Sequence, residues 1–361
     1  RTVLHIYFEH PCAHKVITPV LSPSQERRFG PSLRQQKQRR MAKKAAKKLR
    51  DQEPEETSYL LHTPYLSFHM PPAVLYAGTS RYAPAAPLAL VHSHCFWRAY
   101  TIQLGPSLRA PGVIDPRGVV SWAHNGVSKG DLQRDGAGDG RALKGYRVRG
   151  WRLWGENGRA YVHSVRNLRR ARVAFDDPDV DAHAAKQKAR ADEVVRLRWT
   201  QPLSRQTRRY AFAFRGVEFW WKGTGSVREA RTCGWLLRFC HLKLVATMPG
   251  RSAEERDGAR EVCLGTYTSS VAAEKSGVLE VFDGAVLRVV EERMPSLLEE
   301  ECGEEGEDDC GGADERGKIA KLKRGVLYQL IVATVLCMAS AEKEKRHTLI
   351  DLIIGIAENG G

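Results

Sequence analysis

The pattern of hydrophobic and polar residues changes twice along the chain. Residues 59–290 contain short runs of β-branched and aromatic residues bounded by glycine and proline, which is typical of strands and hairpins. An acidic stretch follows at residues 291–315, and residues 326–339 then form an apolar run interrupted only by Gln329 and Thr334. A helix without a polar face must be surrounded by apolar groups. The pattern therefore predicts a mainly β protein whose C-terminal helix is enclosed by strands or by lipid.

The clearest strand pattern lies at residues 210–222. A two-residue loop at Arg215-Gly216 leaves Glu218 and Lys222 on one face of the predicted hairpin. The other face then collects six large apolar side chains in cross-strand pairs, namely Phe214 with Val217, Phe212 with Phe219 and Tyr210 with Trp221. Because Arg-Gly is a weaker turn pair than Asn-Gly, the turn type stays open.

Other segments are also predicted as strands. A second hairpin is expected at residues 147–163, around Asn157-Gly158. A third turn at Asp283-Gly284 is expected to separate a strand at 277–282 from another at 285–292. Residues 89–104, 194–199 and 236–248 have strand-like composition as well.

The apolar run at residues 326–339 is short for a membrane span. Its fourteen residues rise about 21 Å as a helix, whereas the hydrocarbon core of a bilayer is about 30 Å thick. A helix buried in the protein core is therefore favoured over a membrane anchor.

Composition divides the chain into four predicted parts. Residues 1–58 form a basic, largely disordered arm, in which positions 27–50 hold eleven basic and no acidic side chains. Residues 59–290 form the antiparallel β body, 291–317 an acidic disordered linker, and 318–361 the apolar helix and a tail that pack into the body. Since Met41 precedes an alanine and a lysine cluster, residues 1–40 are also compatible with a leader absent from the mature chain.

The series of strands before an apolar helix resembles a known architecture. Residues 277–284 and 326–339, with the order of the strands, are similar to the tubby C-terminal-like barrel shared by the tubby, phospholipid scramblase and LURP-one-related groups. The resemblance covers about residues 60–345 and implies a closed antiparallel barrel around a hydrophobic helix. The acidic insert departs from that pattern, and no phosphoinositide-binding motif can be carried over. Residues 151–162 and 210–224 also resemble a group of fungal proteins, which implies no activity.

Charge points to an anionic partner. The net charge is +15, and arginine suits phosphate and carboxylate groups. With the family resemblance, this predicts a non-enzymatic module that binds acidic lipid headgroups at a membrane surface, in a cytoplasmic protein. The predicted anion-binding residues are Arg147, Arg149, Arg152, Arg166, Arg169, Arg170 and Arg172.

Two alternatives remain open for these arginines. They fit a nucleic-acid-binding protein, nuclear through its basic arm, in which Trp151 or Trp220 stacks on bases. They also fit an ordinary solvated surface, with the tryptophans in the core. Exposed tryptophan rings would favour stacking. We further hypothesise that the acidic segment 291–315 folds back over the arginine-rich face and weakens its binding to anions.

Signals for catalysis or metal binding are weak. His92 and His94 share one face of a predicted strand and would bind a metal only if His124 or His163 approached. Cys233 and Cys240 have no partner pair at zinc spacing, and eight scattered cysteines indicate reduced thiols. We therefore predict no catalytic residue, metal or cofactor, and favour a protein that is not an enzyme.

Overall fold

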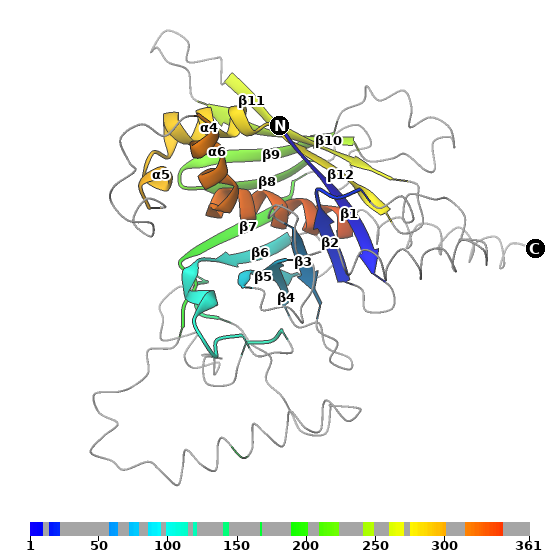
Figure 1. Cartoon of the computed structure of the whole chain (residues 1–361), viewed down its shortest axis with the longest axis vertical. Helices are drawn as coiled ribbons and strands as arrows, with labels where there is room; N and C mark the ends of the chain where they lie inside the picture. The colour runs from blue at the N-terminus through cyan, green and yellow to red at the C-terminus, as the bar shows by residue number, and fades with distance from the viewer. Residues whose placement is uncertain are drawn as a thin grey trace, which may run out of the picture. The chain divides into compact units, whose positions relative to one another are not determined.

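The described part of the chain is mainly β. The computed structural model describes residues 1–9, 14–21, 58–63, 72–78, 86–94, 99–114, 118–120, 140–143, 167, 189–200, 209–223, 241–248, 260–270, 275–300 and 315–341. Within these residues, twelve antiparallel strands close into a barrel in the order β1-β12-β11-β10-β9-β8-β7-β6-β5-β4-β3-β2 (Figure 1). The predicted fold, a closed antiparallel barrel with a C-terminal helix, is confirmed.

The elements are mostly short. The strands are β1 Thr2–Glu9, β2 His14–Thr18, β3 Tyr59–His62, β4 Ala73–Ala77, β5 Pro87–Ser93, β6 Ala99–Leu104, β7 Glu193–Trp199, β8 Arg209–Phe214, β9 Val217–Gly223, β10 His241–Met248, β11 Arg260–Ser269 and β12 Lys275–Val281. The helices are η2 Pro106–Arg109, α4 Asp283–Arg293, α5 Ser296–Glu300, α6 Glu315–Arg324 and a terminal helix, Val326–Ala341.

The chain divides into two compact units. Unit 1 comprises Arg1–Leu60, Ala77–Ala83 and Leu197–Gly361, and therefore holds β1, β2, β8 to β12, helices α4 to α6 and the terminal helix. Unit 2 comprises Leu61–Tyr76 and Pro84–Arg196, and holds β5, β6, η2 and most of β4.

In unit 1, the hairpin β8–β9 has the predicted register. Phe214 pairs with Val217, Phe212 with Phe219 and Tyr210 with Trp221. All six side chains are buried, whereas Glu218 on the opposite face is exposed. Arg215 and Gly216 have φ values of 45° and 79°. Two positive φ angles are typical of the type I′ turn, whose twist matches the flanking strands, so the structure settles the turn type.

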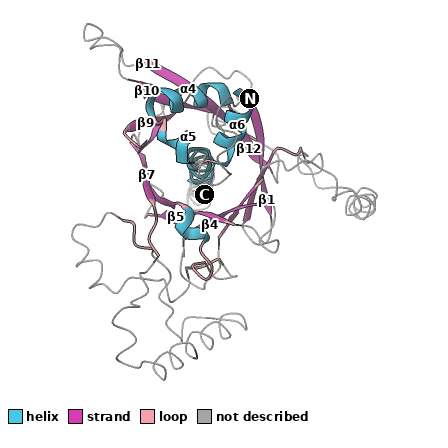
Figure 2. Ribbon diagram, turned by 60° about the vertical axis from the view of Figure 1, so that its left-hand side comes forward, coloured by secondary structure: helices cyan, strands magenta, loops and turns pink. Residues whose placement is uncertain are grey.

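The terminal helix is buried along nearly its whole length. Ile331, Ala333 and Val335 are fully buried. Figure 2 looks nearly along the axis of this helix and shows β1, β9, β10 and β12 of unit 1 around it. The prediction of a core helix is therefore confirmed for the described residues. None of the helices in the described ranges is by itself long and apolar enough to cross a membrane, although α6 and the terminal helix, bent by 54°, satisfy that test as a pair.

The two polar residues of the terminal helix both have hydrogen-bond partners. The Thr334 hydroxyl donates to the carbonyl oxygen of Ile331 at 2.9 Å and accepts a bond from Trp221 Nε1 at 3.2 Å. Gln329 Nε2 donates to the carbonyl oxygen of Arg324 at 2.6 Å, at the bend between α6 and the terminal helix. Because an unpaired buried polar group is costly, these contacts explain why an otherwise apolar helix accommodates both residues.

Unit 2 has its own apolar core. In the β5–β6 pair, Ala89 lies opposite Leu104 and Val91 opposite Ile102, and all four residues are buried. At the end of β6, Gly105 has a φ of 128°, and a Cβ atom there would lie 2.0 Å from Asp192 Oδ2. This carboxylate accepts hydrogen bonds from the backbone N–H and hydroxyl of Ser107 in η2. Gly105 therefore allows β6 to turn beside a carboxylate that caps the next helix.

Several predictions need correction. Residues 1–58 were expected to be an unpacked arm, but Thr2–Glu9 and His14–Thr18 are barrel strands. The strand predicted at 285–292 is wrong, because α4 occupies Asp283–Arg293 and buries Val286, Leu287, Val289 and Val290, a helical spacing. Helices α4 and α5 also extend into the predicted acidic linker. The predicted hairpin at residues 147–163 lies outside the described residues.

The register of β8–β9 gives a first test. Phe212→Ala removes a buried ring that stacks on Phe219 at a centroid distance of 5.0 Å, so we expect a loss of about 3–5 kcal/mol in the free energy of unfolding. The control Glu218→Ala removes an exposed side chain and should cost about 0.5 kcal/mol or less. Urea melts of both variants measure the difference. Equal costs would show that the register is wrong.

Burial of the terminal helix gives a second test. Ile331→Asp places a charge at a position with no solvent exposure, and we expect the variant to lose cooperative folding because no partner compensates the charge. Ile331→Val is the matched control and should cost about 0.5–1.5 kcal/mol. Circular dichroism during heating reports both. An Ile331→Asp protein that melts like the parent would contradict the buried position.

Candidate anion-binding face and helix pocket

The predicted arginine site lies outside the described residues. This applies to Arg147, Arg149, Arg152, Arg166, Arg169, Arg170 and Arg172, and also to Trp151, His124 and His163. The anion site at these arginines therefore stays a prediction. The acidic residues 301–314, which carry most of the fold-back hypothesis, lie outside the described residues as well. Candidate sites can be built from unit 1, where strands β7 to β10 present one face opposite their buried side chains.

Four residues on this opposite face form what we call the basic face: Arg198, Trp220, Lys222 and Lys243. Alternation places Trp220 and Lys222 of β9 on the same side, because they are two residues apart. Lys222 is paired with Lys243 of β10. Arg198 of β7 is paired with Ala211 of β8, which in turn is paired with Trp220. Adjacent strands lie about 4.8 Å apart, so the register sets three cations around one indole ring.

The three cations of the basic face differ in whether a carboxylate is paired with them. Lys222 Nζ forms an ion pair with Glu261 Oε1 of β11, and the Lys222 side chain is only 19 % exposed. Arg198 is exposed and Lys243 is half-buried, and neither forms an ion pair within the described residues. These two side chains are therefore the cations of the face that can meet an external anion.

The acidic neighbours of the basic face lie in a separate row. Glu218 is opposite Thr247, which is opposite Glu261, so the two residues share one row across the strands, and the Glu261 carboxylate reaches Lys222 from that row. Trp220 is half-buried. The arrangement is an aromatic side chain with three cations near it, one of which, Lys222, is paired with a carboxylate from the neighbouring row.

His241 adds little positive charge to this face near neutral pH. It lies two residues before Lys243 on β10. Burial lowers the pKa of His241 below its usual value of 6.5, against the opposing effect of the Glu280 carboxylate, which raises it. A lowered pKa means that the imidazole is neutral at pH 7 and gains its charge only in acid.

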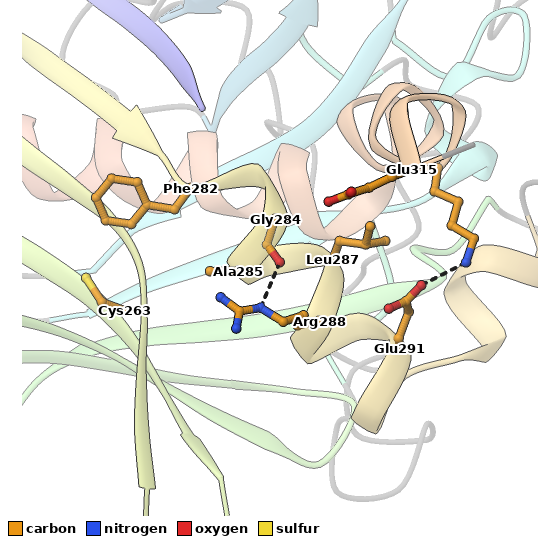
Figure 3. A pocket seen from close by; sticks show the side chains of 9 residues that line it. Cys263, Phe282, Gly284, Ala285, Leu287, Arg288, Glu291 and Glu315 are labelled. Atoms are coloured by element: carbon orange, nitrogen blue, oxygen red, sulfur yellow. Dashed lines mark hydrogen bonds and ion pairs between the residues drawn. The ribbon is translucent and has the colours of Figure 1, made fainter. Parts of the chain in front are cut away.

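A second candidate is a pocket beside the first turns of α4, with a volume of about 700 Å³ (Figure 3). Its size falls within the usual range for small-molecule sites, about 300–1,000 Å³. Phe282, Ala285 and Leu287 supply apolar atoms, and the Cys263 thiol lies across from them on β11. The remaining lining residues are Gly284, Arg288, Glu291, Glu315 and Lys318.

The charges in the helix pocket largely cancel. Lys318 Nζ lies 2.9 Å from Glu291 Oε1 in an ion pair, and Arg288 Nε donates to the carbonyl oxygen of Gly284 at 3.3 Å. Two carboxylates, Glu291 and Glu315, balance these two cations. The pocket therefore has no excess of positive charge, and its guanidinium is bonded to its own helix. The basic face is the better candidate for binding an anion.

The two histidines considered as metal ligands have other partners. His92 Nε2 lies 2.8 Å from Gln103 Oε1, and His94 Nε2 lies 2.8 Å from Thr101 Oγ1. Gln103 in turn donates to the carbonyl oxygens of Gly140 and Ala142. Both histidine contacts lie within unit 2: the first joins β5 to β6, and the second joins the residue after β5 to β6. Among the described residues, no three His, Cys, Asp or Glu side chains lie together as a metal site would require.

Comparison with known proteins does not identify a family. No protein-family model, curated protein or solved structure matches the chain. The resemblance to the tubby C-terminal-like barrel consequently stays a prediction, and arguments about function rest on the residues themselves.

Sequence reasoning had predicted the strands that carry Arg198 and Lys243 but had not assigned these residues to a site. The usable signal is alternation, because each cation is next to a buried residue: Leu197 precedes Arg198, and Leu242 and Leu244 flank Lys243. Placing Arg198 and Lys243 beside Trp220 requires knowing which strands pair with each other. That information is in the register and not in any single segment.

Proposed function

We propose that the protein is a non-enzymatic module that binds anionic lipid headgroups at a membrane surface through the basic face. The observation that carries the proposal is Trp220, a partly open aromatic ring with Arg198, Lys222 and Lys243 around it on paired strands. Tryptophan favours the level of lipid headgroups because its ring is amphipathic. Cations beside it gain from the negative surface potential of acidic lipids, by about 1 kcal/mol for each lysine or arginine.

A nucleic acid is the other anionic partner that such a face could bind. Base stacking needs an open aromatic surface, whereas Trp220 is half-buried in its row between Ala211 and Val245. A partly covered ring is better suited to shallow contact with lipid headgroups than to stacking on a base. This difference favours lipid, and the experiment below includes nucleic acid as an outcome.

Vesicle binding tests the proposal. The full chain is mixed with vesicles of phosphatidylcholine alone or with 30 % phosphatidylserine, and the bound fraction is measured by sedimentation. Salt near 0.15 M limits long-range attraction by other basic segments, because the Debye length is then about 8 Å. We expect binding only to the acidic vesicles, and a decrease of about fivefold for Lys243→Ala, the equivalent of about 1 kcal/mol.

The control is Arg316→Ala, which removes an exposed cation from α6, outside the basic face. It should leave vesicle binding unchanged, and Trp220→Ala should weaken binding as Lys243→Ala does. Equal losses for Lys243→Ala and Arg316→Ala would mean that binding follows net charge alone. Tighter binding to a single-stranded oligonucleotide than to acidic vesicles would replace lipid with nucleic acid as the partner.

A further inference from the structure

The hairpin formed by β1 and β2 closes the barrel along β12. Thr2 lies opposite Val281, Leu4 opposite Leu279 and Ile6 opposite Gly277 in an antiparallel ladder. On its other side β1 is paired with β2, from His5 with Thr18 to Glu9 with His14. Residues 19–58 separate this hairpin from β3 in the sequence. Without it, β12 would have an unpaired edge, which is a ready surface for adding a strand.

One face of the β1–β2 hairpin is apolar and is buried in the core. Leu4, Ile6 and Ile17 are at most 1 % exposed. The ladder with β12 shifts by one residue between Ile6 and Tyr7, and Tyr7 is buried as well. The residue without a partner in this ladder is Ser276, so the bulge lies in β12, and β1 keeps a regular register with β2. The hairpin therefore contributes a row of large apolar side chains that no other described strand supplies at this position.

The buried carboxylate of Asp283 binds the first residues of the chain at the start of β1. The Asp283 side chain, at the beginning of α4, is only 4 % exposed. Its Oδ2 atom accepts a hydrogen bond from the Thr2 hydroxyl at 2.8 Å, and the backbone nitrogen of Arg1 lies 3.0 Å away. Lys323 Nζ of α6 lies 3.8 Å from the same oxygen. Two of these three donors come from Thr2, the first residue of β1, and from Arg1 directly before it, so the site is complete only when the hairpin is in place.

Two further contacts hold the other strand of the hairpin. Lys15 Nζ donates to the Ser340 hydroxyl of the terminal helix. Near the end of β2, the Ser58 hydroxyl donates to Thr18 Oγ1 at 3.1 Å. Side-chain contacts at both strands thus supplement the backbone ladder.

We propose that the β1–β2 hairpin is a separable ligand of the rest of unit 1, and that the edge of β12 together with Asp283 forms its docking site. The ladder supplies affinity, the buried row of apolar side chains sets the register, and Asp283 recognises the hydroxyl of Thr2 at the first strand. The occupant is an extended hairpin with alternating apolar residues. A chain that began at Met41 would lack this hairpin and present the docking site empty.

Peptide exchange in the nicked full-length protein tests the proposal. A protease recognition sequence is inserted between residues 40 and 41, the intact chain is folded, and it is then cut. We expect the fragment of residues 1–40 to coelute with the remaining chain. A fluorescent peptide of residues 1–21, added in excess, should then replace the bound fragment at a rate independent of peptide concentration, because release of the fragment limits exchange.

Substitutions at the docking site should change the exchange rate. Asp283→Asn removes the buried charge, and we expect release to be about tenfold faster or more. Thr2→Val, which leaves Asp283 intact, should accelerate release by a smaller factor. The control is Glu280→Gln, which breaks the ion pair with the exposed Arg1 side chain on the same strand edge. It should change the rate by less than about threefold, since exposed ion pairs contribute little.

The outcomes distinguish a docked hairpin from other arrangements. Loss of the fragment on cutting, whether the remaining chain stays folded or aggregates, would overturn the proposal. Retention without any incorporation of labelled peptide, up to the onset of melting, would show that the hairpin is not separable and would overturn it as well. Equal rates for Asp283→Asn and Glu280→Gln would remove Asp283 from the docking site.

Discussion

The structure of unit 1 depends on one constraint, the burial of a helix that has no polar face. Ala333, Thr334 and Val335 are consecutive and fully buried, so the helix must meet apolar groups all round. Strands can surround such a helix because alternate side chains of a strand project to the same face of the sheet, so one face can be entirely apolar. The Thr334 hydroxyl, bonded to Trp221 Nε1 of β9, fixes the helix in rotation against the sheet. The register of the strands, the faces of their charged residues and the role of β1 follow from that burial.

Sequence patterns predicted this core well where the signal was local. The β8–β9 register followed from alternation about Arg215-Gly216, and the core helix from a run of apolar residues. The pattern failed at Asp283-Gly284, which suits a hairpin turn but also the first turn of a helix. Burial at 286, 287, 289 and 290 identifies the helix, and that periodicity was present in the sequence. The strand at Thr2–Glu9 was missed because residues 1–58 were interpreted as one basic arm from the polar segment that follows this strand.

The candidate site was less predictable because it depends on pairing between distant segments. Arg198, Trp220 and Lys243 come from three strands, and only the ladder places them together. The arginines between residues 147 and 172, which dominated the charge pattern, lie outside the described residues. Net charge predicted an anionic partner but could not identify a face. The same alternation that buries Trp221 turns Trp220 outward, so one register determines both the core packing and the basic face.

Native-state hydrogen exchange tests directly whether the barrel strands and the terminal helix depend on each other. If burial of the helix holds unit 1 together, the slowest amides of residues 330–336 and of β9 should exchange with the same opening free energy, equal to that of global unfolding. Denaturant should affect both sets with the same slope, because they open in one event. Helix amides that exchange through a smaller opening, while those of β9 stay protected, would show that the strands fold without the helix and would contradict this account.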